Sequence, residues 1–180
     1  MNAANLITLA RLLSVPVTVW LIFEERWLPA LALFIAAGLS DALDGYLAKH
    51  HDMKTELGAF LDPLADKTLL VSIYLVLGFH GHLPLWLVIM VVSRDLLIVG
   101  GILLSLAMGI ELRIAPSLPG KVNTVVQIAL AGTALGFLAG LPLPPDLLQI
   151  LVYAVAITTV ASGAGYLVNW TRMHGTGTTT

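Results

Sequence analysis

The chain of 180 residues contains no cysteine and few charged residues. Without cysteine it can form neither disulfides nor thiolate metal sites, and it has no thiol nucleophile. Charged residues make up 11% of the chain, whereas a soluble domain is about a quarter charged. The formal net charge of −2 also argues against a nucleic-acid-binding protein, because such a protein needs a basic surface.

Hydrophobic residues dominate instead, at 58% of the chain, and the mean hydropathy is +0.92. This composition predicts an integral membrane protein with one domain over residues 1–174 and a low-complexity, disordered tail over residues 175–180. A helix needs about 20 residues to cross a hydrocarbon core about 30 Å thick. Turn or charge signals separate six apolar runs of roughly this length: Asn5–Phe23, Leu28–Lys49, Pro63–Phe79, Leu83–Met108, Leu118–Leu138 and Leu147–Thr171. The sequence therefore predicts an all-α bundle of six transmembrane helices.

Lysine and arginine are unevenly distributed over the ends of these runs. Cytoplasmic loops of membrane proteins carry an excess of both residues. With the N-terminus inside, the outer loops hold only Arg26, and the inner ends hold Lys49, Lys54, Arg113, Lys121 and Arg172. We therefore expect both termini at the cytoplasmic face of a membrane, and a bacterial inner membrane as the location.

Four aspartates lie around the junction of the second and third runs. Asp41 and Asp44 are three residues apart, and Asp62 and Asp66 are four residues apart, so each pair falls on one face of a helix. Carboxylates are costly at membrane depth and persist there only where something cationic or aqueous compensates them. Two such faces turned toward each other would form a cage of oxygen ligands for hard divalent cations.

Each aspartate also has a plainer interpretation when it is taken alone. Asp62 followed by Pro63 fits a helix N-cap with proline at the first helical position. Asp41 and Asp44 could be ordinary polar residues near a helix end. Four carboxylates at these spacings nevertheless favour a site.

The stretch from Asp41 to Asp66 resembles the signature of the CDP-alcohol phosphatidyltransferases. Every spacing of that signature is retained, and its fixed residues recur here as Asp41, Asp44, Gly45, Ala48, Gly58, Asp62 and Asp66. One further position, normally arginine, is Lys49, which offers a point charge in place of a bidentate fork. The resemblance extends from Asn5 to about Trp170. It implies a homodimeric six-helix membrane enzyme that uses two divalent ions, Mg²⁺ or Mn²⁺, to displace CMP from a CDP-linked lipid by an alcohol acceptor.

The resemblance also implies roles for individual residues. Asp66 would be the base that deprotonates the acceptor, and the metal ligands would be Asp41, Asp44, Asp62 and Asp66. Carboxylates suit Mg²⁺ or Mn²⁺, two cations can clamp a pyrophosphate, and glycine lets a nucleotide approach the backbone closely. The residues expected to bind CDP are Asn5, Thr8, Asp41, Asp44, Gly45, Ala48, Lys49 and Gly58.

Basic residues form a second group of candidates, for the phosphate of the acceptor: Arg11, Lys67, Arg94, Arg113 and Lys121. Three alternatives stay open at this point. Arg94 could form an intramembrane ion pair with Asp95, Lys121 could anchor the inner end of its helix, and Lys49 could extend to the membrane interface. Asn5, Thr8 and Arg11 share one helix face, and such polar side chains can also simply join helices.

Within the family, the chain most resembles the mitochondrial-type cardiolipin synthases, whose acceptor is phosphatidylglycerol. The stretches Ser93-Arg94-Asp95-Leu96 and Lys121-Val122-Asn123-Thr124 are among those that favour them. The alternative is phosphatidylglycerophosphate synthase, whose acceptor is glycerol 3-phosphate and which more typically has Arg-Glu in place of Arg94-Asp95. A remoter alternative is a cation transporter, because intramembrane aspartates also mark ion paths. Transporter sites usually lie between internal repeats near the bilayer midplane, and no inverted repeat is evident.

Overall fold

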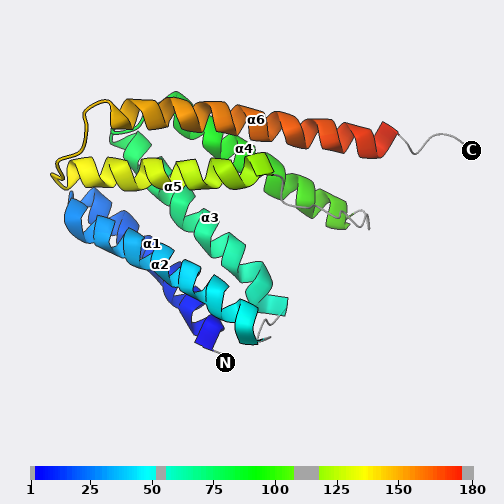
Figure 1. Cartoon of the computed structure of the whole chain (residues 1–180), viewed down its shortest axis with the longest axis horizontal. Coiled ribbons are helices and arrows are strands. Elements are labelled where there is room, and N and C mark those ends of the chain that lie inside the picture. The colour runs from blue at the N-terminus through cyan, green and yellow to red at the C-terminus, as the bar shows by residue number, and fades with distance from the viewer. Residues whose placement is uncertain (1–2, 52–55, 108–117, 176–180) are drawn as a thin grey trace, which may run out of the picture. The chain divides into compact units, whose positions relative to one another are not determined.

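The computed structural model describes residues 3–51, 56–107 and 118–175, with side chains over residues 9–40, 67–100 and 118–166. The described residues form six α-helices and three connecting turns, with no strand among them (Figure 1). The helices are α1 (Ala3–Phe23), α2 (Trp27–His51), α3 (Glu56–Phe79), α4 (Leu85–Ala107), α5 (Leu118–Leu138) and α6 (Leu147–Gly175). The all-α prediction is confirmed, and α5 has the bounds that its apolar run predicted.

Helix α3 differs most from its predicted run, because it begins at Glu56 and not at Pro63. Asp62 therefore lies inside the helix, and its interpretation as an N-cap is wrong. An N-cap and a following proline form only a local signal, which the rest of the helix overrides here. The consequence is that Asp62 and Asp66 both have helical backbone, so their four-residue spacing does place them on one helix face.

Three helices end with the same hydrogen-bonded turn. In α3 and α5 the second residue after the helix is a glycine, and these residues, Gly81 and Gly140, take positive φ angles of 75° and 81°. The amide of Leu141 donates to the Gly136 carbonyl (3.0 Å), and the amide of Gly140 donates to the Phe137 carbonyl (3.0 Å). This is a Schellman motif, whose left-handed residue is usually glycine.

In α1 the corresponding left-handed residue is Glu25, with φ 54°. The amide of Arg26 donates to the Leu21 carbonyl (2.8 Å), and the amide of Glu25 donates to the Ile22 carbonyl (3.0 Å). A side chain with a Cβ atom is strained in this conformation, whereas glycine is not. The turn after α1 thus has the same geometry as the other two, but its left-handed position is occupied by a glutamate and not by a glycine.

The described chain divides into two compact units. The first comprises residues 1–83 and 131–145, and in it α1 packs against both α2 and α3. Its buried core includes Ile22, Ala30, Ile73 and Leu77. The spacing of Ile73 and Leu77 places both on one face of α3.

The second unit comprises residues 84–130 and 146–180, and in it α4 packs against α6. Leu87 and Val91 of α4 are buried, as are Leu130 of α5 and Val155 of α6. Unlike an ordinary apolar core, this unit also buries polar side chains, which are described below.

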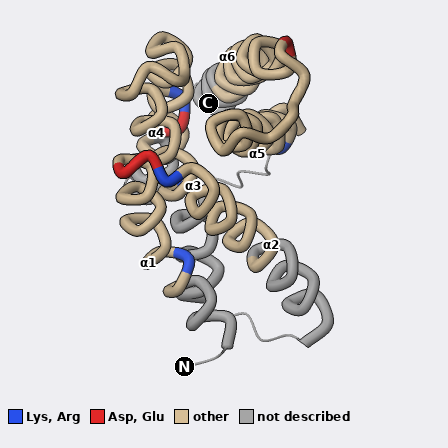
Figure 2. Tube along the Cα trace, turned by 90° about the vertical axis from the view of Figure 1, so that its left-hand side faces the viewer, with Lys and Arg blue, Asp and Glu red and all other residues tan. Residues whose placement is uncertain are grey.

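Two described segments are long and apolar enough to cross a membrane, Leu118–Leu138 and Leu147–Tyr166. Three more are apolar but shorter: Leu9–Phe23, Trp27–Ser40 and Lys67–Phe79. Charged residues are few along the described helices (Figure 2). Large apolar side chains such as Leu97 and Ile157 are about 70% exposed, at 71% and 70%. Such surfaces are typical of lipid contact, since soluble monomers rarely expose large contiguous apolar patches.

Candidate functional site

The four aspartates come from two helices of the first unit. Asp41 and Asp44 lie on α2, and Asp62 and Asp66 lie on α3. Because α1 packs against both of these helices, its residues Asn5, Thr8 and Arg11 belong to the same unit. The two aspartate pairs and the polar residues of α1 thus lie on helices of the same packed unit.

The side chains of most predicted site residues lie outside the described part of the structure. This holds for Asn5, Thr8, Asp41, Asp44, Gly45, Ala48, Lys49, Gly58, Asp62 and Asp66, while Arg113 lies outside the described residues altogether. Where side chains are described, no group of three or more histidines, aspartates or glutamates gathers to hold a metal ion. The four aspartates of the motif offer carboxylate oxygens, which are the donors that suit a hard divalent cation such as Mg²⁺ or Mn²⁺.

A groove of about 300 Å³ lies between α1 and α2 beside the acidic stretch, lined by Ala10, Arg11, Ser14, Leu33, Ala36, Ala37 and Ser40. Its small side chains leave the space open, and Ser40 directly precedes Asp41. Arg11 is buried, at 4% exposure. The hydroxyls of Ser14 and Ser40 donate to carbonyls of their own helices, at 2.6 and 2.8 Å. The groove therefore brings a buried guanidinium to the level at which the acidic stretch begins.

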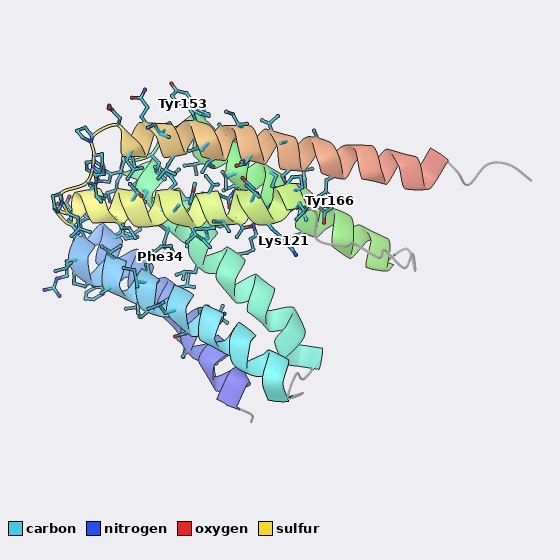
Figure 3. The ribbon with its side chains drawn as sticks, viewed as in Figure 1. Phe34, Lys121, Tyr153 and Tyr166 are labelled. Atoms are coloured by element: carbon cyan, nitrogen blue, oxygen red, sulfur yellow. The ribbon has the colours of Figure 1, made fainter. Side chains whose placement is uncertain are left out.

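The remaining described basic candidates differ in their surroundings. Lys67 follows Asp66 on α3 and is half-buried, whereas Lys121 is exposed on α5. Figure 3 shows Lys121 near the start of α5 and Tyr166 toward the same end of the α5–α6 pair, while Tyr153 lies toward the other end of α6. Lys121 is therefore accessible to an anionic ligand at one end of the second unit.

Arg94 makes the ion pair that the sequence had left open. Its Nη1 donates to Asp95 Oδ1 at 2.6 Å, and its Nη2 donates to the Ser162 hydroxyl on α6. Arg94 and Asp95 are 8% and 7% exposed, so the pair is largely removed from solvent. The contact joins α4 to α6, and the positive charge of Arg94 is balanced within the unit.

A second polar contact joins α5 to α6. The Thr159 hydroxyl donates to Asn123 Oδ1 at 3.0 Å. The Thr158 hydroxyl lies 2.9 Å from the same atom and 2.8 Å from the Ala154 carbonyl of its own helix, so its one proton is shared between these acceptors. Asn123 and Gln127, one turn apart on α5, are fully buried. None of Asn123, Thr158, Thr159 and Ser162 was predicted to have a role of its own from the sequence. The signal that could have found them is the occurrence of polar residues at helical spacing within apolar spans, where they join helices.

Comparison with known proteins identifies the family. The family model of the CDP-alcohol phosphatidyltransferases matches residues 1–162. The chain is 37% identical over 173 residues to a probable phosphatidylglycerophosphate synthase of Mycobacterium tuberculosis, covering 92% of this chain and 80% of that protein. It therefore belongs to the CDP-alcohol phosphatidyltransferase family, whose members are membrane-associated enzymes that generally depend on divalent metal ions.

The relatives bear two kinds of name. The chain is 34% identical over 178 residues to a cardiolipin synthase (CMP-forming) of Rattus norvegicus, covering 90% of this chain and 59% of that protein. It is also 33% identical over 199 residues to a chloroplastic CDP-diacylglycerol–glycerol-3-phosphate 3-phosphatidyltransferase of Oryza sativa, covering 97% and 58%. The chain thus spans less than two thirds of the length of these two relatives. These relatives are all named as enzymes of phosphatidyl transfer or phospholipid synthesis, but their names imply different acceptors.

Proposed function

We propose that this protein transfers the phosphatidyl group of CDP-diacylglycerol to phosphatidylglycerol and releases CMP, which is the reaction of a cardiolipin synthase. The observation that carries the proposal is the array of four aspartates on two helices of one unit, Asp41 and Asp44 on α2 with Asp62 and Asp66 on α3. The proposed location is a bacterial inner membrane that all six helices cross, with the site at the cytoplasmic face. The distribution of lysine and arginine supports that orientation.

The proposed metal ligands are Asp41, Asp44, Asp62 and Asp66, whose carboxylates match two Mg²⁺ or Mn²⁺ ions in chemistry and in charge. When bound, such ions neutralise the bridging and leaving oxygens of a pyrophosphate. The chain itself supplies the nucleotide contacts, from Asn5 and Thr8 on α1, from Gly45, Ala48 and Lys49 on α2, and from Gly58 on α3.

Asp66 is the proposed base. It takes the proton of the acceptor hydroxyl, and the resulting alkoxide attacks the β-phosphorus of CDP-diacylglycerol. The new phosphorus–oxygen bond to the acceptor forms as the bond to the CMP oxygen breaks, and CMP leaves with the electron pair. No residue of the motif is an obvious covalent nucleophile, so we propose direct displacement with inversion at phosphorus.

The resemblance of stretches such as Ser93-Arg94-Asp95-Leu96 to cardiolipin synthases supports phosphatidylglycerol as the acceptor. A phosphodiester carries one negative charge, whereas a phosphate monoester such as glycerol 3-phosphate carries nearly two at pH 7. Arg94 pairs with Asp95 and adds no net charge to its unit. The other basic candidates for the acceptor are Arg11, Lys67, Arg113 and Lys121, whose charge suits either acceptor. Glycerol 3-phosphate is the second candidate, because two of the relatives are named for its product or for its use.

An acceptor panel tests the proposal. Purified protein is supplied with CDP-diacylglycerol, Mn²⁺ and either phosphatidylglycerol or glycerol 3-phosphate, and the lipid products are separated by mass. We expect cardiolipin to form at a rate well above that of phosphatidylglycerophosphate. The reverse preference would assign glycerol 3-phosphate as the acceptor, and no CMP release with either would refute the proposed function.

The same assay tests the assignment of the base. Loss of a general base typically costs about 10²–10⁴-fold in rate, so Asp66→Asn should release CMP at least about 100-fold more slowly than the unsubstituted protein. Asp146→Asn is the matched control, because Asp146 is an exposed carboxylate in the turn before α6.

We further propose a homodimer, as the resemblance implies. The mass of the protein purified in detergent, corrected for bound detergent, tests this and should equal that of two chains.

A further inference from the structure

One face of α6 carries the polar contacts that hold the second unit together. Thr159 and Ser162 are three residues apart and therefore share that face. Thr158 and Thr159 reach Asn123 of α5, and Ser162 reaches Arg94 of α4. Asn123, Thr159 and Ser162 are at most 1% exposed, so these contacts lie inside the unit.

Asn123 is held against α6 by hydroxyls on two successive residues. Its Oδ1 accepts from the Thr159 hydroxyl at 3.0 Å and lies 2.9 Å from the Thr158 hydroxyl, whose one proton is shared with the Ala154 carbonyl of α6 at 2.8 Å. Two contacts that converge on one atom restrict both the height of α5 along α6 and its rotation about its own axis. Its Nδ2 is buried and has no hydrogen-bond partner among the described residues. The side chain is thus kept at this place although its amide is only half satisfied, which is costly for a purely structural residue.

The rotation of α5 determines where Lys121 points. Lys121 precedes Asn123 by two residues, about 3 Å along the axis and about 200° around it. Asn123 faces α6 and is fully buried, while Lys121 lies on the exposed side. Because a helix rotates as a rigid body, contacts that hold the Asn123 amide against α6 also fix the direction in which Lys121 leaves the opposite side of α5.

Of the two cations of this unit whose side chains the structure describes, Arg94 and Lys121, only Lys121 is exposed. Arg94 pairs with Asp95, whereas Lys121 is exposed at the end of α5 (Figure 3). An ammonium group on a flexible stem binds a phosphate as a point charge, so its contribution depends on where its helix holds it.

We propose that Asn123 is a positioning residue, which acts through α5 to hold Lys121 at the phosphate of the acceptor lipid. This rests on the proposed function, and it applies to either acceptor because both carry a phosphate. Through the contacts of Thr158 and Thr159 with Asn123, α6 fixes the position of the start of α5, where Lys121 lies. Removing them should weaken binding of the acceptor and leave binding of CDP-diacylglycerol unchanged.

The first test is kinetic. Asn123→Leu, and separately Thr158→Val with Thr159→Val, should raise the KM for the acceptor about 10-fold and change the KM for CDP-diacylglycerol less than twofold. The matched control is Thr124→Val, because the hydroxyl of Thr124 donates within its own helix, to the Gly120 carbonyl at 3.2 Å. Lys121→Ala should raise the acceptor KM similarly, and adding Asn123→Leu to it should have little further effect, since the two substitutions remove one interaction.

The second test measures the distance between α5 and α6 and does not depend on enzyme activity. The chain has no cysteine, so spin labels can be attached to cysteines placed at the exposed positions of Val125 on α5 and Ile157 on α6. Asn123→Leu should broaden the distance distribution between the labels, and Thr124→Val should not. The valine pair removes hydroxyls with little change in shape, so it carries both tests if Asn123→Leu does not accumulate as folded protein.

The outcomes separate the two proposals. An unchanged label distance, an unchanged acceptor KM, or an equal rise in both KM values would overturn the role of Asn123. Failure of the unsubstituted protein to release CMP with either acceptor would instead refute the proposed function.

Discussion

Replacement of Asp95 by asparagine should destabilise the protein by several kcal/mol. Arg94 and Asp95 are 8% and 7% exposed, so the substitution leaves a buried guanidinium that keeps its hydrogen bond with Ser162 but loses its negative partner. Arg94 lies nine residues after the first residue of α4, about 14 Å along its axis, and therefore well within the helix. Removing one member of a buried ion pair typically costs about 3–5 kcal/mol.

Two further variants order the expected effects. Ser162→Ala removes one hydrogen bond to a charged group and should cost about 1.5–3 kcal/mol. Replacing both charges, with Arg94→Met and Asp95→Leu, removes the desolvated ions together and should be close to neutral. The predicted order of destabilisation is thus Asp95→Asn, then Ser162→Ala, then the double variant.

The free energy of unfolding can be followed in detergent micelles by adding sodium dodecyl sulfate and recording circular dichroism. Asp146→Asn serves as the control for removal of an exposed carboxylate. A cost below about 1 kcal/mol for Asp95→Asn, the range of exposed pairs, would refute the reasoning. It would mean that water or another anion reaches the guanidinium once Asp95 is neutral.

Three other predictions follow from the turns and the proposed metal site. Glu25→Gly should raise the free energy of unfolding by about 0.5–1 kcal/mol in the same titration, because Glu25 has a left-handed φ of 54°. Gly140→Ala should lower the free energy of unfolding by about 1 kcal/mol, since φ is 81° there. A change of the same sign for the two substitutions would contradict this account of the turns. Chelation with EDTA should abolish CMP release and Mn²⁺ should restore it, whereas activity that persists in EDTA would exclude the carboxylate metal site.

The amino-acid sequence was sufficient for the local features of this protein. Long apolar runs predicted every helix, and α5 begins and ends at the residues of its run. The start of α3 was the largest departure, because a local cap signal at Asp62 and Pro63 was outweighed by the helical residues that precede it. The acidic motif identified the family, since metal ligation requires particular residue types at particular spacings, and spacings are visible in a sequence.

Only the tertiary structure decided which polar residues meet across helices. Ser162 is 68 residues from Arg94, and Thr158 is 35 residues from Asn123. The periodicity of a helix shows which residues share its face, but not which helix that face meets or at what height. That choice depends on how whole side-chain surfaces fit together. For this reason the sequence alone could not decide whether Arg94 forms an ion pair, and it gave no role to Asn123, although both residues lie in helices that the sequence predicted.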